Sequence, residues 1–257
     1  GHGCGAVCTL ELSGFAGGHS GIEIDKGRAN TNKLMGELLL CLAEEFPVQL
    51  MQLSGGKFDN AIPNHTTATL LVDAGSVEAV KARAEKWWQE TSVHYAQSDA
   101  NGTLTAAPGG ELCGSALTPE DTRRMAEWIT KIPNGVRSMS KDMQELVETS
   151  SNLGILKLSG SEFRVTVSVR SSLNHVWKEQ MEELHALASQ YGAVFYAYGD
   201  YPAWEYRKES ILRPLMAEVY QELYGKQPSI AMTHGGLECG IFSDKLPGLD
   251  CVSFGPD

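Results

Sequence analysis

The order of the predicted secondary structure constrains this fold most, because the same five elements occur twice in succession. A strand, a helix, two strands and a second helix are expected over about residues 7–95 and again over about residues 103–200. Such an order buries apolar strand faces under helices. The sequence therefore predicts an α+β fold of two ferredoxin-like β-α-β-β-α units, each an antiparallel sheet with helices on one face.

The individual elements are predicted from hydrophobic periodicity and from helix and turn signals. Thr118 followed by Pro119 is a strong helix start, and Ser76 is a candidate N-cap. The expected strands are 7–15, 48–54, 66–73, 103–107, 152–159, 162–171 and 193–198. The expected helices are 28–46, 76–95, one that starts at 118, and 175–191.

The character of the sequence changes at Pro202. An amphipathic helix is expected over 208–224, followed by a strand over 229–233, a short helix and a last strand over 249–254. A unit of about 50 residues cannot build a sheet core by itself. We therefore expect this segment to be the end of an incomplete α/β domain, whose other half is not in this chain.

Charge and composition exclude several classes of partner. The 21 Lys and Arg residues against 32 Asp and Glu give a net charge of −11, which disfavours nucleic acid and anionic membranes. No apolar run approaches the roughly 20 residues of a transmembrane helix, and no secretory signal is visible. The cysteines lack paired spacing, which predicts reduced thiols and a cytoplasmic protein; they are at positions 4, 8, 41, 113, 239 and 251.

His19 is a candidate for chemistry, because it lies in a glycine-rich loop between a predicted strand and a predicted helix. Glycines let the backbone approach a ligand closely, and an imidazole N–H donates well to a developing oxyanion. A surface histidine without a role is the alternative, and the residue pattern leaves both open.

Two further positions have comparable alternatives. Asn60 precedes Ala-Ile-Pro, where it is either a turn former or a ligand contact. Arg170 ends a β-branched strand, where it either holds a carboxylate bidentately or pairs with a surface acid.

The segment from His234 to Gly240 follows a predicted strand and enters a helix. Ligands bind at this position in open α/β sheets, and a helix N-terminus favours an anion. The histidines show no HxD, HExxH or HxxxH spacing of the kind that predicts a metal site.

Five stretches, taken in order along nearly the whole chain, resemble the aminoacyl-histidine dipeptidases, a branch of the co-catalytic zinc metallopeptidases. These are Gly17-Gly18-His19-Ser20-Gly21 with Gly27-Arg28-Ala29-Asn30, Gly55-Gly56 through Asn60-Ala61-Ile62-Pro63, Val147-Glu148-Thr149-Ser150-Ser151-Asn152-Leu153-Gly154, His234-Gly235-Gly236-Leu237-Glu238-Cys239-Gly240 and Pro247-Gly248-Leu249-Asp250.

The resemblance implies a division of the chain. Residues 1–203 would be a lid or dimerisation domain, and residues 204–257 the C-terminal part of a catalytic α/β domain. It also implies two zinc ions in the full-length enzyme, held by ligands outside this chain.

By the same resemblance, His19 stabilises the oxyanion of the scissile carbonyl. Asn60 and Arg170 contact the carboxylate end of the substrate, and the backbone of Gly236 lines the same pocket. The expected function is metal-dependent hydrolysis of Xaa-His dipeptides. The chain by itself is expected to be inactive, with a dipeptide as substrate and a possible homodimer through the lid. A non-catalytic lid or dimerisation module is the alternative.

Overall fold

The computed structural model describes residues 1–141, 146–231 and 237–255. The predicted α+β class is confirmed. The chain divides into two compact units, and both are discontinuous in sequence. The first comprises Gly1–Gly135, Ser151–Ser168 and Ala186–Ala193, and the second comprises Val136–Ser150, Val169–His185 and Val194–Asp257.

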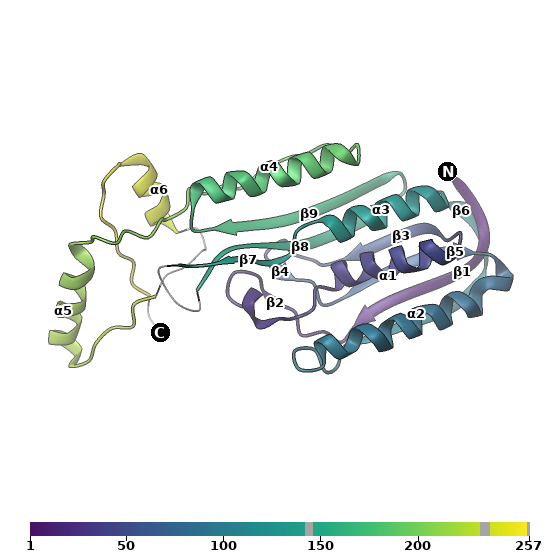
Figure 1. The fold of residues 1–257 in the computed structure, drawn as a ribbon, viewed down its shortest axis with the longest axis horizontal. Coiled ribbons are helices and arrows are strands. Elements are labelled where there is room, and N and C mark those ends of the chain that lie inside the picture. Colours follow the sequence, from purple (N-terminus) through teal and green to yellow (C-terminus); the bar gives the residue numbers. More distant parts are fainter. Residues whose placement is uncertain (142–145, 232–236, 256–257) are drawn as a thin grey trace. The chain divides into compact units, whose positions relative to one another are not determined.

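One sheet runs through the repeated elements (Figure 1), and its path is β6-β1-β5-β3-β8-β7, with β9 paired to β8. The expectation of two separate sheets is therefore wrong. Its strands are β1 (His2–Ser13), β3 (Gln49–Gly55), β5 (Thr66–Val72), β6 (Thr103–Ser115), β7 (Gly135–Met139), β8 (Val147–Ser159) and β9 (Glu162–Ser171). The two sets join because β3 offers β8 an unpaired edge, where Leu53 pairs with Leu158 and Gly55 with Leu156.

Strand β6 changes its place relative to the prediction. It was expected to open the second set, but it pairs antiparallel with β1 along nearly its whole length. The first set is therefore a complete β-α-β-β-α-β unit with strand order β6-β1-β5-β3, and the second set lacks a first strand of its own.

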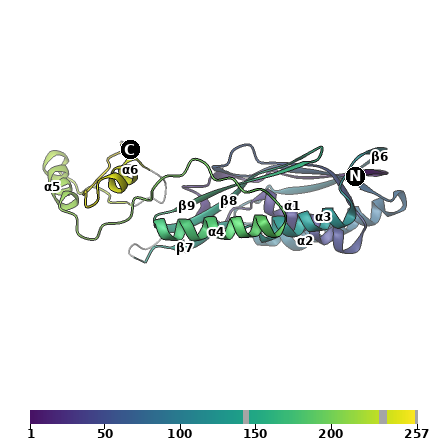
Figure 2. The ribbon, with the colours of Figure 1, turned by 90° about the horizontal axis from the view of Figure 1, so that it is seen from above.

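Three helices lie together on one side of the strands (Figure 2): α1 (Thr31–Glu45), α2 (Val77–Ser92) and α3 (Pro119–Lys131). Thr118 caps α3 as predicted, since its hydroxyl accepts the N–H of Asp121 at 3.0 Å. Ser76 does stand at the start of α2, but its side chain makes no capping hydrogen bond. Asn30 caps α1 by accepting from the backbone of residues 32 and 33.

The core of the first unit lies between this sheet and these helices. Its largest fully buried side chains are mostly leucines from β1, α1, β3 and β5: Leu10, Leu12, Leu34, Leu38, Leu39, Leu42, Leu50, Leu53, Leu70 and Leu71. Helices α1 and α3 approach each other closely at Gly36, where an added Cβ would lie only 2.3 Å from Cγ2 of Ile129. Lys33 strengthens this contact by donating to the carbonyls of Ile129, Thr130 and Ile132 at the end of α3.

The hairpin β8–β9 and helix α4 (Asn174–Gln190) form as predicted. The strand expected over 193–198 does not form. Val194, Tyr196 and Tyr198 do alternate with other residues, but their side chains are 75%, 80% and 71% exposed. Alternation predicts a strand only where a neighbouring strand supplies the ladder hydrogen bonds, and within the described part of the chain no strand pairs with this segment.

The last part of the second unit contains α5 (Leu212–Tyr224) and α6 (Glu238–Lys245). Helix α5 starts later than the expected 208, because the carboxylate of Asp250 accepts the N–H groups of Ile211 and Leu212 at 2.7 and 2.9 Å. The strand expected over 249–254 is irregular, and so are residues 229–231 of the strand expected over 229–233. Residues 232 and 233 lie outside the described part.

Cys4 and Cys113 form a disulfide with a Cα–Cα distance of 4.1 Å, which corrects the prediction of reduced thiols. The two lie directly opposite in the β1–β6 register. Their separation of 109 residues gives no spacing signal in the sequence. Four cysteines remain as thiols, and burial raises the pKa of Cys8 among them. Within the described part of the chain, each helix is too short or too polar to cross a membrane.

Candidate substrate-recognition site

The structure brings His19 and the Asn60 turn together in the first unit. A short antiparallel pair joins β2 (Gly18–His19) to β4 (Ala61–Ile62), with His19 opposite Ala61 and Gly18 opposite Ile62. His19 thus lies one register position from Asn60. The side chains of both residues are exposed, so both are accessible to a ligand.

The imidazole of His19 has a defined hydrogen-bonding pattern. The backbone N–H of Gly21 donates to its Nδ1 at 3.1 Å. A nitrogen that accepts a hydrogen bond has an available lone pair, so the proton of the neutral ring is on Nε2. The Nε2–H group is then the donor that His19 can offer to a substrate.

An ion pair fixes the backbone around His19. Glu23 accepts the His19 N–H through Oε2 at 2.9 Å, and its Oε1 pairs with Arg28 at 2.9 Å. Arg28 also donates to the carbonyl of Gly17. The His19 N–H and the Arg28 guanidinium together lower the pKa of Glu23. Glycine is favoured at position 18, because its φ of 135° is one that residues with a side chain rarely adopt.

The turn that carries Asn60 is tied to the same loop. Ser20 is 1% exposed, and both its backbone N–H and its hydroxyl donate to the carbonyl of Asn60, at 2.9 and 3.0 Å. The backbone of Asn60 is therefore fixed while its side chain remains exposed.

The other two predicted residues belong to other parts of the sequence. Arg170 is half-buried near the end of β9 and belongs to the second unit. Gly236 lies outside the described residues, as does His234. The joint role predicted for His19, Asn60, Arg170 and Gly236 therefore stays a prediction.

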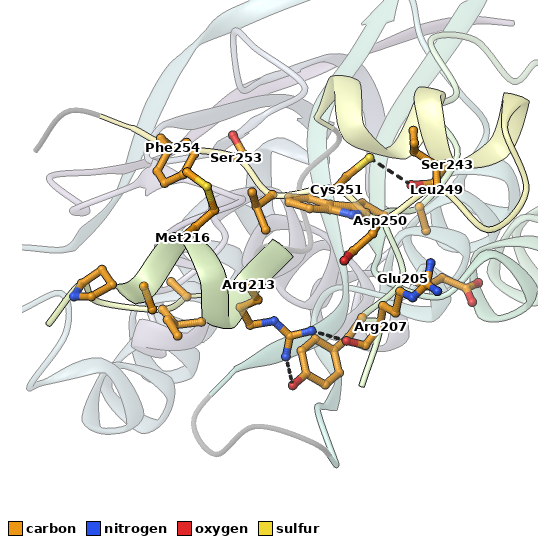
Figure 3. A pocket seen from close by; sticks show the side chains of 18 of the residues that line it. Glu205, Arg207, Arg213, Met216, Ser243, Leu249, Asp250, Cys251, Ser253 and Phe254 are labelled. Carbon is orange, nitrogen blue, oxygen red and sulfur yellow. Dashed lines mark hydrogen bonds between the residues drawn. The ribbon is translucent and has the colours of Figure 1, made fainter. Parts of the chain in front are cut away.

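A cavity of about 550 Å³ lies within the second unit and contains none of the predicted site residues (Figure 3). Its charged side chains are bonded to neighbours within the unit. Arg213 donates to the Tyr206 hydroxyl at 2.6 Å, and Arg207 donates to the carbonyl of Gly248 at 2.7 Å. Asp250 caps α5. These bonds stabilise the fold of the segment.

The described residues do not fit a metal centre. Nowhere among residues 1–141, 146–231 and 237–255 do three His, Cys, Asp or Glu side chains converge on a point that could hold a metal ion. A stable protein site for zinc needs at least three such ligands.

The sequence did not reveal the residues that orient His19. Glu23 and Arg28 lie five positions apart in an irregular loop, so no helical or strand periodicity relates them. Ser20 has an ordinary turn composition, and its contact with Asn60 depends on a strand pair of only two residues. Arg28 does fall within one of the stretches that carry the family resemblance, which was its only signal.

Comparisons with known proteins show which families and solved structures this chain is similar to. The family model of the peptidase dimerisation domain of the M20 type matches residues 10–99. The chain is 33% identical over 248 residues to the cytosol non-specific dipeptidase of Escherichia coli strain K12, which covers 96% of this chain and 51% of that protein. The structure of this chain matches that of the aminoacylhistidine dipeptidase of Vibrio alginolyticus with a TM-score of 0.88 and 29% identity. The match covers 98% of this chain and 51% of the other. The chain thus spans about half the length of each of these relatives.

Proposed function

We propose that this chain supplies the substrate-recognition part of a metal-dependent dipeptidase that cleaves Xaa-His dipeptides. The proposal is supported by the match of residues 10–99 to a peptidase dimerisation domain and by the similarity of nearly the whole chain to two dipeptidases. Residues 1–203 are the lid and residues 204–257 contribute to the catalytic domain. The chain by itself is inactive in this proposal.

The orientation of the His19 ring is the observation that carries the proposal. The Gly21 N–H occupies Nδ1, so the exposed ring presents a neutral Nε2–H donor. The oxygen of a scissile carbonyl gains negative charge as it is attacked, and a fixed N–H donor stabilises that charge more than it stabilises the ground state. His19 therefore acts as the oxyanion donor.

The other three residues have binding roles in the proposal. Asn60, next to His19 in the register, hydrogen-bonds the carboxylate end of the dipeptide. The Arg170 guanidinium binds that carboxylate bidentately, and the backbone of Gly236 lines the same pocket. A dipeptide with a free carboxylate fits such a donor set, because all of these groups donate hydrogen bonds.

Two zinc ions belong to the full-length enzyme in this proposal. The described residues do not fit a metal pair. In the proposal the ligands lie in sequence outside this chain, and we derive no catalytic step from the metal. The protein is cytoplasmic in the proposal, although the Cys4–Cys113 disulfide weighs against a reducing compartment.

A graft tests the proposal directly. This chain replaces the matched 248 residues of the E. coli dipeptidase, and hydrolysis of Ala-His is measured. We expect an active graft, and we expect His19→Ala to lower its kcat by about 10²–10³ with little change in KM. His94→Ala is the matched control, because His94 is also an exposed histidine of the first unit. An active graft in which His19→Ala retains full kcat refutes the oxyanion role.

A dimerisation module is the second candidate function, and the match of residues 10–99 to a peptidase dimerisation domain favours it. It predicts a homodimer of the isolated chain in sedimentation equilibrium, together with an inactive graft. A monomeric chain whose graft is active excludes this candidate.

A further inference from the structure

Asn152 in strand β8 holds the turn of Asn60 from the side opposite to Ser20. Its amide nitrogen donates to the carbonyls of Asp59 and Ala61 at 2.9 and 2.8 Å. These are the two carbonyls that flank Asn60. Both N–H groups of one buried side chain are thus used to fix the backbone on either side of a single exposed residue.

Buried partners determine the orientation of the Asn152 amide. Asn152 is 2% exposed, and its Oδ1 accepts from Asn30 at 3.3 Å. Asn30 also donates to Asn134 at 2.8 Å, and Asn134 accepts the backbone N–H of Leu153 at 2.9 Å. A flipped amide at 152 would face two carbonyls with its oxygen, so the network permits one orientation.

Two glycines allow the turn to lie directly on β8. A Cβ at Gly154 would lie 2.7 Å from Cα of Asp59, and a Cβ at Gly56 would lie 1.8 Å from the carbonyl oxygen of Gly154. Gly56 also has a φ of 71°, which residues other than glycine rarely adopt. The stretch Ser151–Gly154 therefore forms a platform on which residues 56–61 rest.

We propose that Asn152 is a positioning residue that sets the distance between His19 and Asn60. Ser20 holds the carbonyl of Asn60 from the His19 side, and Asn152 holds the neighbouring carbonyls from the sheet. The platform therefore fixes the two exposed side chains relative to each other before a substrate binds. Such preorganisation raises the rate because less ordering is needed in the transition state. The inference rests on the proposed function only in taking the His19–Asn60 pair as the dipeptide contact.

The first experiment needs no activity. In the isolated chain, Asn152→Asp replaces both donors by an oxygen and keeps the shape of the side chain. We expect hydrogen exchange of the Ser20 amide, which bonds to Asn60, to speed up by about tenfold or more as the turn loses two hydrogen bonds. Thr122→Val is the control. Thr122 is fully buried, and its hydroxyl accepts the backbone N–H of Leu50 at 3.0 Å outside the platform. We therefore expect the loss of this bond to leave the Ser20 amide protected.

The second experiment places the same variants in the graft. We expect Asn152→Asp to lower kcat/KM for Ala-His by about 10- to 100-fold, while the control Thr122→Val changes it little. If Asn152→Asp does not fold, Asn152→Ser, which keeps one donor, is measured in both experiments and a smaller effect of the same kind is expected.

Unchanged exchange at Ser20 overturns the inference. Faster exchange with unchanged kcat/KM in an active graft also overturns it, because the turn would then move without consequence. If the graft is inactive with every variant, the proposed function fails, and the exchange at Ser20 still decides whether Asn152 positions the turn.

Discussion

The first unit and residues 194–255 use similar sequence patterns with opposite results. In the first unit, leucines at helical spacing on α1 are fully buried, among them Leu34, Leu38 and Leu42. At the N-cap of α5 and along the helix, Ile211, Leu215, Val219 and Leu223 have the same spacing, but they are 84%, 49%, 37% and 71% exposed. Gly240 is the one buried residue among the described positions of 194–255.

The difference teaches that periodicity identifies an apolar face but does not supply its partner. Helix α1 packs on the sheet and contacts α2 and α3 beside it, so its leucines are buried. The apolar face of α5 is uncovered by the described part of the chain. This contrast supports the proposal that residues 204–257 belong to an α/β domain that is completed by other sequence.

The largest expected effect separates these two regions by stability. Leu38→Ala should lower the free energy of unfolding by about 2–5 kcal/mol, because it leaves a cavity in a packed core. Leu223→Ala should change it by no more than about 0.5 kcal/mol, because that side chain is 71% exposed. Urea unfolding followed by circular dichroism measures both. A cost for Leu223→Ala as large as that for Leu38→Ala would mean that the face of α5 is covered, and the comparison would fail.

The same contrast explains which parts of the fold could be predicted. The helices α1 to α4 and the hairpin β8–β9 were predicted because their caps and periodicity are local, as at Thr118 and Pro119. Three expected strands, 193–198, 229–233 and 249–254, were not found in their described residues. Each has the composition of a strand, but a strand requires a neighbouring strand, which a local pattern does not reveal.

Less of the site than of the fold could be predicted. His19 and Asn60 were predicted as site residues, and the structure places them next to each other, while their roles stay predictions. Their supporting residues were missed, because the contacts of Asn152 with residues 59 and 61 span about 90 positions of sequence. A buried asparagine in a strand has no distinguishing local signal. Its role follows only from the pairing of β8 with β3.

The disulfide should have the next largest effect, and only in the first unit. Reduction of Cys4–Cys113, which closes a separation of 109 residues, should lower the free energy of unfolding by about 2–4 kcal/mol. The measurement is urea unfolding with and without a reductant. Hydrogen exchange of Leu212 at the start of α5 should not change. The Cys4→Ser/Cys113→Ser double variant is the control, since the reductant should have no further effect on it. An unchanged unfolding curve on reduction of the wild-type chain would restore the prediction of reduced thiols.

The smallest expected effect is a difference in the acid response of two helix caps. The cap of α3 is the neutral hydroxyl of Thr118, whereas the cap of α5 is the carboxylate of Asp250. The N–H of Leu212, with the Ser210 hydroxyl, the N–H of Ile211 and the charge of Arg207, lowers the pKa of Asp250 below its usual range. A folded-state pKa below the unfolded one means that the cap is fully stabilising above the unfolded pKa of about 3.9, and that its contribution is lost as the pH falls through the folded pKa.

We therefore expect acid to release the start of α5 before the start of α3. Amide chemical shifts of Ile211 and Leu212 should titrate below about pH 4. The backbone N–H of Asp121, which donates to the hydroxyl of Thr118, should keep its capping bond in that range. Asp250→Asn keeps a neutral acceptor, so the titration of Ile211 and Leu212 should disappear in that variant. A titration that persists in Asp250→Asn would assign it to another group.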